Sequence, residues 1–211
     1  MKAARASASR VPLAPAGVEG FEGINRFFEL ASGLWIAQIL PGDFYVSRQN
    51  EIISTVLGSC ISTCVRDPKA GIGGMNHFML PEDPGGRDGA SARYGLFAME
   101  QLINALLTRG ARRESMEIKI VGGGRVIKGM GDVGRSNIEF VRDFLAAECM
   151  PILAEDVGLS VARRVRYNPS TGSLRVLHLP MTENDKVAER EVELASKIRG
   201  GRQSRAEIEL F

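Results

Sequence analysis

Helical periodicity is confined to two stretches of this chain, and this distribution limits the folds that it can adopt. In residues 92–109 apolar side chains recur every three or four positions up to Gly110, and residues 137–149 have the same amphipathic spacing. Most other segments between residues 40 and 180 are short and apolar, as strands are. Because strands and helices do not alternate regularly, a Rossmann domain is excluded. The chain is predicted to form an α/β fold, a mixed α/β sandwich with β-sheet layers and two main helices.

Eight segments have the β-branched or alternating composition of strands. We expect strands at residues 44–46, 51–57, 60–65, 71–80, 117–121, 152–157, 162–167 and 173–179. Residues 21–40 are apolar enough to pack against this body, but their pattern fits either a helix or a strand. The Gly-rich composition of residues 82–92 and of residues 122–134 predicts two loops.

The length of the chain predicts one folded domain with an extension at each end. A chain of 211 residues is ordinary for one such domain. Residues 1–20 are interpreted as a flexible N-terminal arm, residues 21–180 as the single domain, and residues 181–211 as a charged C-terminal tail. Residues 187–198 of the tail could form a short helix. We expect this tail either to be solvated and dispensable or to dock on a partner through its two apolar C-terminal residues.

The charge balance and the cysteine content exclude several classes of protein. The formal net charge is only +2, whereas a nucleic-acid-binding protein usually carries a larger basic excess. Cys60, Cys64 and Cys149 give no even disulfide framework, which favours a reducing compartment. No apolar run reaches the roughly 18–20 residues of a membrane span, and Arg5 and Arg10 interrupt any secretory signal. The sequence therefore predicts a cytoplasmic protein without membrane insertion and without a nucleic-acid partner.

Cys60 and His77 are the residues best suited to carry chemistry. Cys60 follows Leu57-Gly58-Ser59, where the glycine lets the backbone turn and present a thiol beside free main-chain amides. His77 lies in an apolar segment, and pairing of the strands on either side of residues 67–71 would bring it next to Cys60. An imidazole beside a thiol takes its proton and lowers the thiol pKa, which is what a cysteine nucleophile requires.

Other uses of these residues remain open at this point. A free cysteine is usually a buried apolar residue, and a histidine in an apolar strand usually belongs to the core. Cys60, Cys64 and His77 could hold zinc, although the second close pair of ligands of a structural zinc site is missing. The glycine run at residues 122–124 follows a predicted strand, as phosphate-binding loops do, but lacks the Lys and Ser/Thr of a P-loop. A tight turn near the site is the simpler interpretation.

A series of short motifs runs through residues 40–180 in a characteristic order. These motifs are Ser54-Thr-Val-Leu-Gly-Ser-Cys60, Gly73-Gly-Met-Asn-His-Phe-Met-Leu-Pro81, Tyr94-Gly95, Ala98-Met-Glu100, Gly122-Gly-Gly124, Gly134-Arg-Ser-Asn137, Arg164-Val165 and Asn168-Pro-Ser-Thr-Gly172. In order and spacing they resemble the CheD family, the chemoreceptor glutamine deamidases of bacterial chemotaxis. The first two motifs are the most specific part of the resemblance.

The resemblance implies a protein-glutamine glutaminase, an amidohydrolase with a Cys-His-Thr catalytic set and a fold similar to that of deamidating cysteine toxins. By this resemblance Cys60 is the nucleophile and His77 the base, and no metal or organic cofactor is required. The hydroxyl that orients the imidazole is assigned to Thr55, with Ser54 as the alternative. Neighbouring strand residues point to opposite faces, so only one of the two can serve.

The implied reaction converts receptor glutamines to glutamate through a Cys60 thioester and releases ammonia. The main-chain amides of Ser59 and Cys60 are the candidates for an oxyanion hole. The candidates for loops that contact the substrate are Gly58, Asn76, Gly122 and Gly123.

The resemblance also implies the partners of the protein. They are the methyl-accepting chemotaxis receptors, through their cytoplasmic helical bundle, and a CheC-type phosphatase. Deamidation there would tune chemotaxis adaptation, because each event turns a neutral side chain into a carboxylate. The alternative is a non-catalytic adaptor that binds receptors or a CheC-type phosphatase and leaves Cys60 idle. A cysteine protease or transglutaminase that uses the same thioester is a second alternative.

Overall fold

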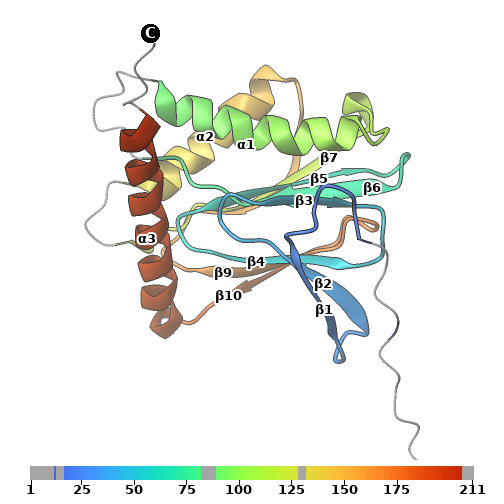
Figure 1. Cartoon of the computed structure of the whole chain (residues 1–211), viewed down its shortest axis with the longest axis horizontal. Coiled ribbons are helices and arrows are strands. Elements are labelled where there is room, and N and C mark those ends of the chain that lie inside the picture. The colour runs from blue at the N-terminus through green and yellow to red at the C-terminus, as the bar shows by residue number, and fades with distance from the viewer. Residues whose placement is uncertain (1–11, 13–16, 82–88, 128–131, 206–211) are drawn as a thin grey trace, which may run out of the picture.

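The computed structural model describes Pro12 and residues 17–81, 89–127 and 132–205. Two five-stranded sheets face each other, two helices cover the outer face of one sheet, and a third helix lies across one end of both (Figure 1). Each sheet contains parallel and antiparallel pairs. The predicted α/β fold with mixed sheets is thus confirmed, whereas the third long helix was not expected.

The first sheet has the strand order β1-β2-β4-β9-β10. Its strands are β1 (Asn25–Glu29), β2 (Leu34–Gln38), β4 (Ile52–Leu57), β9 (Arg163–Tyr167) and β10 (Leu174–His178). Strands β2 and β4 are parallel and the other neighbours antiparallel. The ambiguous residues 21–40 contain the β1–β2 hairpin, in which the Phe28 and Trp35 rings lie across the pair with their centroids 5.8 Å apart and their planes tilted.

The second sheet has the order β3-β6-β5-β7-β8 and lies under the two covering helices. Its strands are β3 (Phe44–Ser47), β5 (Ile61–Asp67), β6 (Ile72–Asn76), β7 (Glu117–Gly122) and β8 (Ile152–Val157). The predicted pairing across residues 67–71 is present, because β5 and β6 are antiparallel and Asp67 pairs with Ile72. After β6 ends, a further bridge joins Ile61 to Phe78 and carries the pairing past His77.

The helices α1 (Ala90–Leu107) and α2 (Val133–Ala147) are those predicted from periodicity, and a short 3-10 helix, η1 (Arg113–Ser115), follows α1. Their apolar stripes pack on the second sheet and form one core. The α1 stripe consists of Met99, Leu102, Ile103 and Leu106, and the α2 stripe of Ile138, Val141, Phe144 and Leu145. A second core lies between the sheets and contains Cys60 and Cys64. In the described part of the chain, no helix combines the length and apolar character that a membrane span requires.

The C-terminal segment differs from a solvated tail. Helix α3 (Met181–Arg205) stands along one end of the sandwich (Figure 1), and it includes the predicted short helix at residues 187–198. Asn184, Val187 and Glu191 are buried on one face of α3, at the three- and four-residue spacing of a helix that packs on one side. The predicted anchors Leu210 and Phe211 lie outside the described residues. So do most of residues 1–20 and the centres of the two predicted loops.

Candidate active site

The candidate site lies at the end of the sandwich, where the chain crosses from one sheet to the other. Strand β4 of the first sheet ends at Leu57, and β5 of the second sheet begins at Ile61. Residues 58–60 form the crossing, which we call the nucleophile loop, and it places Cys60 fully buried between the two layers. The structure therefore puts the predicted cysteine at a junction of sheets rather than inside a strand.

His77 follows β6 and lies beside Cys60. Its main chain is held by the turn before β3, since His77 N–H donates to the Asp43 carbonyl at 2.9 Å and Gly42 N–H donates to the His77 carbonyl at 2.7 Å. The Cys60 Sγ, a ring nitrogen of His77 and a carboxylate oxygen of Glu191 all lie within 4.8 Å of one another. The spacing of the two predicted residues thus corresponds to closeness in space.

The alternation of β4 separates Ser54 from Thr55. Thr55 points inward with Ile53 and Leu57, and its Oγ1 lies 2.8 Å from His77 Nδ1. Ser54 points to the other face, where its hydroxyl donates to the Val165 carbonyl at 3.0 Å. Of these two hydroxyls, that of Thr55 therefore contacts the imidazole and that of Ser54 does not.

The hydrogen bonds of Thr55 select one tautomer of His77. The Thr55 hydroxyl donates its single proton to the Ile39 carbonyl at 2.9 Å, so toward His77 it can only accept. His77 Nδ1 must then carry the proton, which leaves Nε2 with a free lone pair. Nε2 is buried and has no hydrogen-bond partner among the described residues. The imidazole is thus prepared to accept a proton at Nε2.

The main-chain amides of the nucleophile loop point at one spot. Gly58 N–H and Cys60 N–H donate to Glu191 Oε1 at 2.8 and 3.1 Å, and Ser59 N–H donates to Oε2 at 2.7 Å. The Ser59 hydroxyl adds a fourth bond to Oε2, at 2.6 Å. Three consecutive amides that converge on one carboxylate form a nest for negative charge, as an oxyanion hole does.

Burial and Glu191 set the protonation states of the pair. Burial lowers the pKa of His77 to about 4, although the negative charge of Glu191 acts in the opposite direction. The ring is therefore neutral at pH 7. Burial also raises the pKa of the Cys60 thiol well above its ordinary value, and the charge and hydrogen bond of Glu191 raise it further. The expectation that His77 lowers the thiol pKa is thus wrong while Glu191 lies in the site.

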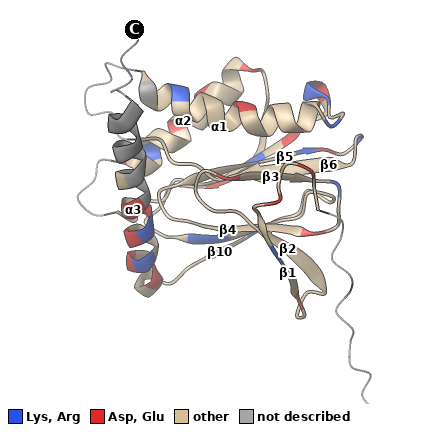
Figure 2. Cartoon of the chain, in the orientation of Figure 1, with Lys and Arg blue, Asp and Glu red and all other residues tan. Residues whose placement is uncertain are grey.

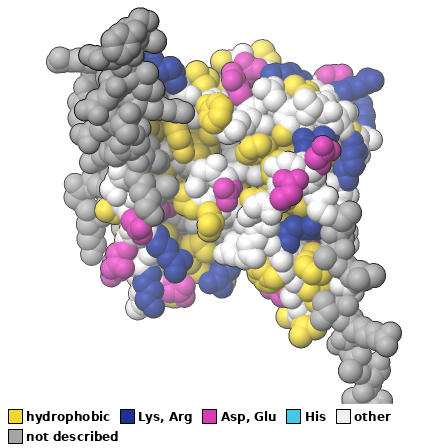
Figure 3. Space-filling view, viewed as in Figure 1, with side chains coloured by type: hydrophobic (Ala, Val, Ile, Leu, Met, Phe, Trp, Pro, Cys, Tyr) yellow, Lys and Arg dark blue, Asp and Glu magenta, His cyan; other side chains and the backbone are white. Residues whose placement is uncertain are grey.

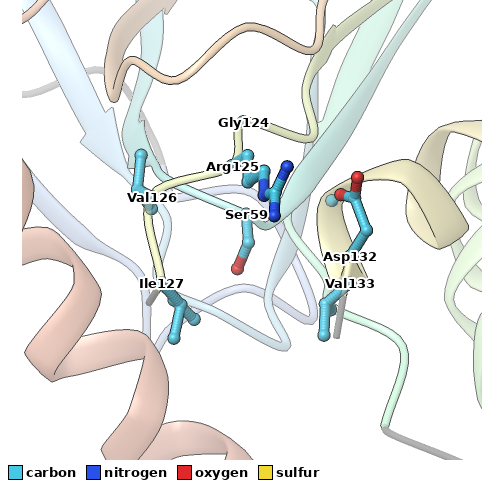
Figure 4. Close-up of a pocket in the computed structure, with 8 residues that line it drawn as sticks. Ser59, Gly124, Arg125, Val126, Ile127, Asp132 and Val133 are labelled. Carbon is cyan, nitrogen blue, oxygen red and sulfur yellow. The ribbon is translucent and has the colours of Figure 1, made fainter. Parts of the chain in front are cut away.

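The glycine run forms the wall behind the nucleophile loop. Gly123 N–H donates to the Cys60 carbonyl and Gly124 N–H to the Gly58 carbonyl, both at 2.7 Å. Gly122 has a φ of 115°, and a Cβ there would lie 2.4 Å from the Cys60 carbonyl oxygen. A small pocket opens beside Ser59, between residues 124–127 and the start of α2 (Figure 4).

Other residues of interest have mainly structural contacts. The Asn76 side chain is used inside the core, since its Oδ1 accepts from Thr63 N–H at 2.7 Å and its Nδ2 donates to the Ala98 carbonyl. Cys64 lies on β5 in the inter-sheet core, and Cys149 is exposed after α2.

Thiolate, imidazole and carboxylate are ligands that zinc accepts, and Cys60, His77 and Glu191 are close enough to share an ion. Both oxygens of Glu191 already accept main-chain hydrogen bonds. The raised pKa keeps the thiol protonated, whereas a metal-bound cysteine is a thiolate. The arrangement therefore fits a carboxylate in an amide nest better than a ligand set.

Two site residues were not found by the sequence reasoning. One is Glu191 on α3. The other is Asn137 on α2, whose Nδ2 donates to the Ser59 carbonyl at 2.7 Å and whose Oδ1 accepts from Leu80 N–H at 2.8 Å. Asn137 ends the motif Gly134-Arg-Ser-Asn137, and this motif was the available signal for it. Glu191 lies in a charged segment, and nothing in the sequence distinguishes it from neighbours such as Glu189 and Arg190, which are exposed.

The fold and site therefore define a two-sheet α/β sandwich that brings together a buried thiol, an oriented imidazole and convergent amides, the groups on which a cysteine nucleophile depends. Residues 79–178 match the family described as "CheD chemotactic sensory transduction". The chain is 46% identical over 181 residues to a protein of Hahella chejuensis named "Probable chemoreceptor glutamine deamidase CheD". This alignment covers 84% of this chain and 86% of that protein. A second relative, "Probable chemoreceptor glutamine deamidase CheD 1" of Dechloromonas aromatica, is 48% identical over 191 residues, 89% of this chain and 94% of its own. Identity is 46% to a "Probable chemoreceptor glutamine deamidase CheD" of Hydrogenovibrio crunogenus, over 89% of this chain and all of that protein. This chain belongs to the CheD family.

Proposed function

We propose that this protein is a chemoreceptor glutamine deamidase that uses Cys60 as its nucleophile and His77 as its base. It hydrolyses the side-chain amide of receptor glutamines to glutamate and ammonia and so tunes chemotaxis adaptation. The observation that carries the proposal is the closeness of Cys60 to His77, whose Nδ1 is hydrogen-bonded to Thr55, beside three convergent main-chain amides. The chain that holds this arrangement belongs to the CheD family.

The first half of the reaction forms a thioester. His77 Nε2 takes the proton of the Cys60 thiol, and the sulfur attacks the carbonyl carbon of the glutamine side chain. The amides of Gly58, Ser59 and Cys60 stabilise the negative oxygen of the tetrahedral intermediate. The protonated His77 then gives its proton to the departing nitrogen, the carbon–nitrogen bond breaks, and ammonia leaves.

The second half of the reaction hydrolyses the thioester. His77 Nε2 takes a proton from water, and the resulting hydroxide attacks the thioester carbon while the same amides hold the oxyanion. The carbon–sulfur bond breaks, His77 returns the proton to the Cys60 sulfur, and the product is glutamate. The thiol, the imidazole and water supply every group, so the proposed reaction draws on no cofactor.

Thr55 acts in this proposal as a positioning residue. By accepting from Nδ1–H it keeps the Nε2 lone pair toward Cys60, which is the part that Asp or Asn takes in other cysteine and serine enzymes. Gly122 and Gly123 act behind the nucleophile loop, where their close approach keeps its carbonyls turned away from the substrate.

We place the reaction in the cytoplasm, where the receptors present their cytoplasmic helical bundle and where three free cysteines persist. Residues 21–180 form the catalytic domain in this proposal. A CheC-type phosphatase is proposed as a second partner on family grounds alone.

The test uses the purified protein and the cytoplasmic fragment of a chemoreceptor. Intact-mass analysis and peptide mapping should find glutamines converted to glutamates by the wild-type protein and none converted by Cys60→Ala. Cys64→Ala is the matched control, because it removes a buried thiol of the same strand region that lies outside the cluster of Cys60, His77 and Glu191. Activity that survives in Cys60→Ala, or that is lost equally in Cys64→Ala, would contradict the nucleophile assignment. Receptor binding without conversion by the wild type would favour the adaptor.

A further inference from the structure

The buried side chains in the described part of helix α3 lie on a single face. Asn184 Oδ1 accepts from Ala162 N–H at 3.0 Å, and its Nδ2 donates to the Ser160 carbonyl at 3.1 Å. One turn later, Val187 joins a small apolar cluster with Val126, Ala162 and Leu179. One further turn brings Glu191 into the candidate site. The three contacts lie along one stripe, so α3 is docked as a unit.

The opposite face of the described part of α3 is exposed and strongly charged. Asp185, Lys186, Glu189 and Arg190 are exposed. The acidic and basic positions on the described turns of α3 are coloured in Figure 2, and charged side chains gather over the lower part of α3 in Figure 3. Among the side chains of α3 that the structure describes, the apolar contacts are those of Val187 and Ala188 with this small apolar cluster. Between residues 181 and 193, the polar contacts that hold the helix come from Asn184 and Glu191.

Glu191 is buried although its side chain is a carboxylate, which ordinarily favours solvent. Its exposed fraction is 3%, and among the described residues no Lys or Arg forms an ion pair with it. Burying a carboxylate is costly unless it is hydrogen-bonded. The compensation comes from the four donors of the nucleophile loop, three of which are main-chain amides. The carboxylate is thus bound by the groups that the proposed reaction uses.

We infer that α3 is a tethered product analogue that closes the active site, with Glu191 in the position of the glutamate that the reaction forms. The inference rests on the proposed function, since deamidation leaves a glutamate carboxylate beside Cys60 and the oxyanion amides. Glu191 is chemically that side chain, and its carboxylate lies within 4.8 Å of the Cys60 sulfur and a His77 nitrogen. A substrate glutamine cannot enter until α3 moves away.

Docking of α3 also deactivates the nucleophile. The Glu191 carboxylate disfavours a thiolate beside it, and burial of Cys60 at 0% exposure keeps reagents out. Release of α3 therefore opens the site and makes the thiolate easier to form. A receptor helix that binds in place of α3 would both open the site and remove Glu191 from the thiol. The receptor must therefore compete with α3 for the site.

The test compares Glu191→Ala with Glu189→Ala, which removes an exposed carboxylate from the same helix. Iodoacetamide labelling of Cys60, followed by peptide mapping, reports access to the thiol and does not depend on deamidase activity. We expect labelling in Glu191→Ala to be roughly tenfold faster or more, since each unit by which a thiol pKa falls raises its thiolate fraction about tenfold. Glu189→Ala should label at the wild-type rate. A chain that ends at Pro180 should behave as Glu191→Ala does, and far-UV circular dichroism checks the fold of each variant.

A second measurement follows the identity of the side chain. In Glu191→Gln, the protein should convert the new side-chain amide to the acid within the same molecule, at a rate that does not depend on protein concentration. In the double variant that also carries Cys60→Ala, the amide should remain unconverted. Persistence of the amide in the protein with intact Cys60 would count against the product position.

Three results separate this inference from its rivals. Wild-type labelling rates and receptor turnover in both Glu191→Ala and the shortened chain would overturn it. If EDTA raised the labelling rate of the wild-type protein to that of Glu191→Ala, a bound metal ion and not helix α3 would be the group that blocks the site. Faster labelling without receptor conversion in any variant would uphold the closing helix while the proposed deamidation fails.

Discussion

Replacing Thr55 by valine tests the proposed role of the hydroxyl. Valine keeps the shape of threonine but removes two hydrogen bonds, one with His77 Nδ1 at 2.8 Å and one to the Ile39 carbonyl at 2.9 Å. A buried N–H left without a partner costs about 1–3 kcal/mol, and the ring can avoid this cost by moving its proton to Nε2, where it can no longer act as a base. At about 1.4 kcal/mol per tenfold in rate, kcat should fall roughly 5- to 150-fold.

The assay measures initial rates of ammonia release from a receptor cytoplasmic fragment over a range of concentrations. KM should change little, because Thr55 lies behind the imidazole and is buried. Thr55→Ser keeps the hydroxyl and should retain most of the rate, and Ser54→Ala removes a hydroxyl from the opposite face of β4. Nitrogen NMR of His77 should show loss of the Nδ1–H tautomer in Thr55→Val. A kcat for Thr55→Val equal to that of the wild type, or an equal loss in Ser54→Ala, would refute the reasoning.

Two further predictions concern stability. Burial lowers the pKa of His77 from its ordinary 6.5 to about 4, so between these pH values the unfolded chain binds more protons than the folded one. The free energy of unfolding in urea should therefore fall as the pH drops from 6.5 toward 4, and His77→Gln should flatten this fall; an unchanged slope would show that other groups dominate. Asn137→Ala should lower the free energy of unfolding by about 2–6 kcal/mol, since it leaves one buried N–H and one buried carbonyl unpaired. Replacing the exposed Asn104 on α1 by alanine is the control, and equal losses in both variants would refute the assignment.

The elements of the fold were largely predictable because their signals are short-range. All eight predicted strand segments overlap observed strands, and both predicted helices are present with ends shifted by a few residues. Residues 21–40 remained ambiguous because aromatic side chains suit a helix or a strand, and only the pairing of β1 with β2 resolves them. Helix α3 was underestimated for a related reason. Its sequence has few apolar residues, and its buried face holds two polar side chains, Asn184 and Glu191.

The sequence by itself determined which residues could meet. A turn between two antiparallel strands brings residues a fixed number of positions apart into register, so the closeness of Cys60 and His77 could be expected from local pairing. The glycines of the nucleophile loop and of its supporting wall were also visible, since only glycine tolerates such close backbone approach.

Only the tertiary structure decided which hydroxyl faces the imidazole and what lies over the thiol. Ser54 and Thr55 are equivalent in an alternating strand until the packing of two sheets makes one face of β4 the inner one. Glu191 is more than a hundred residues from Cys60, and its place in the amide nest depends on where α3 docks after β10. Local periodicity encodes strands and helices, but contacts between distant elements depend on how complete surfaces fit together, which no short stretch of sequence contains.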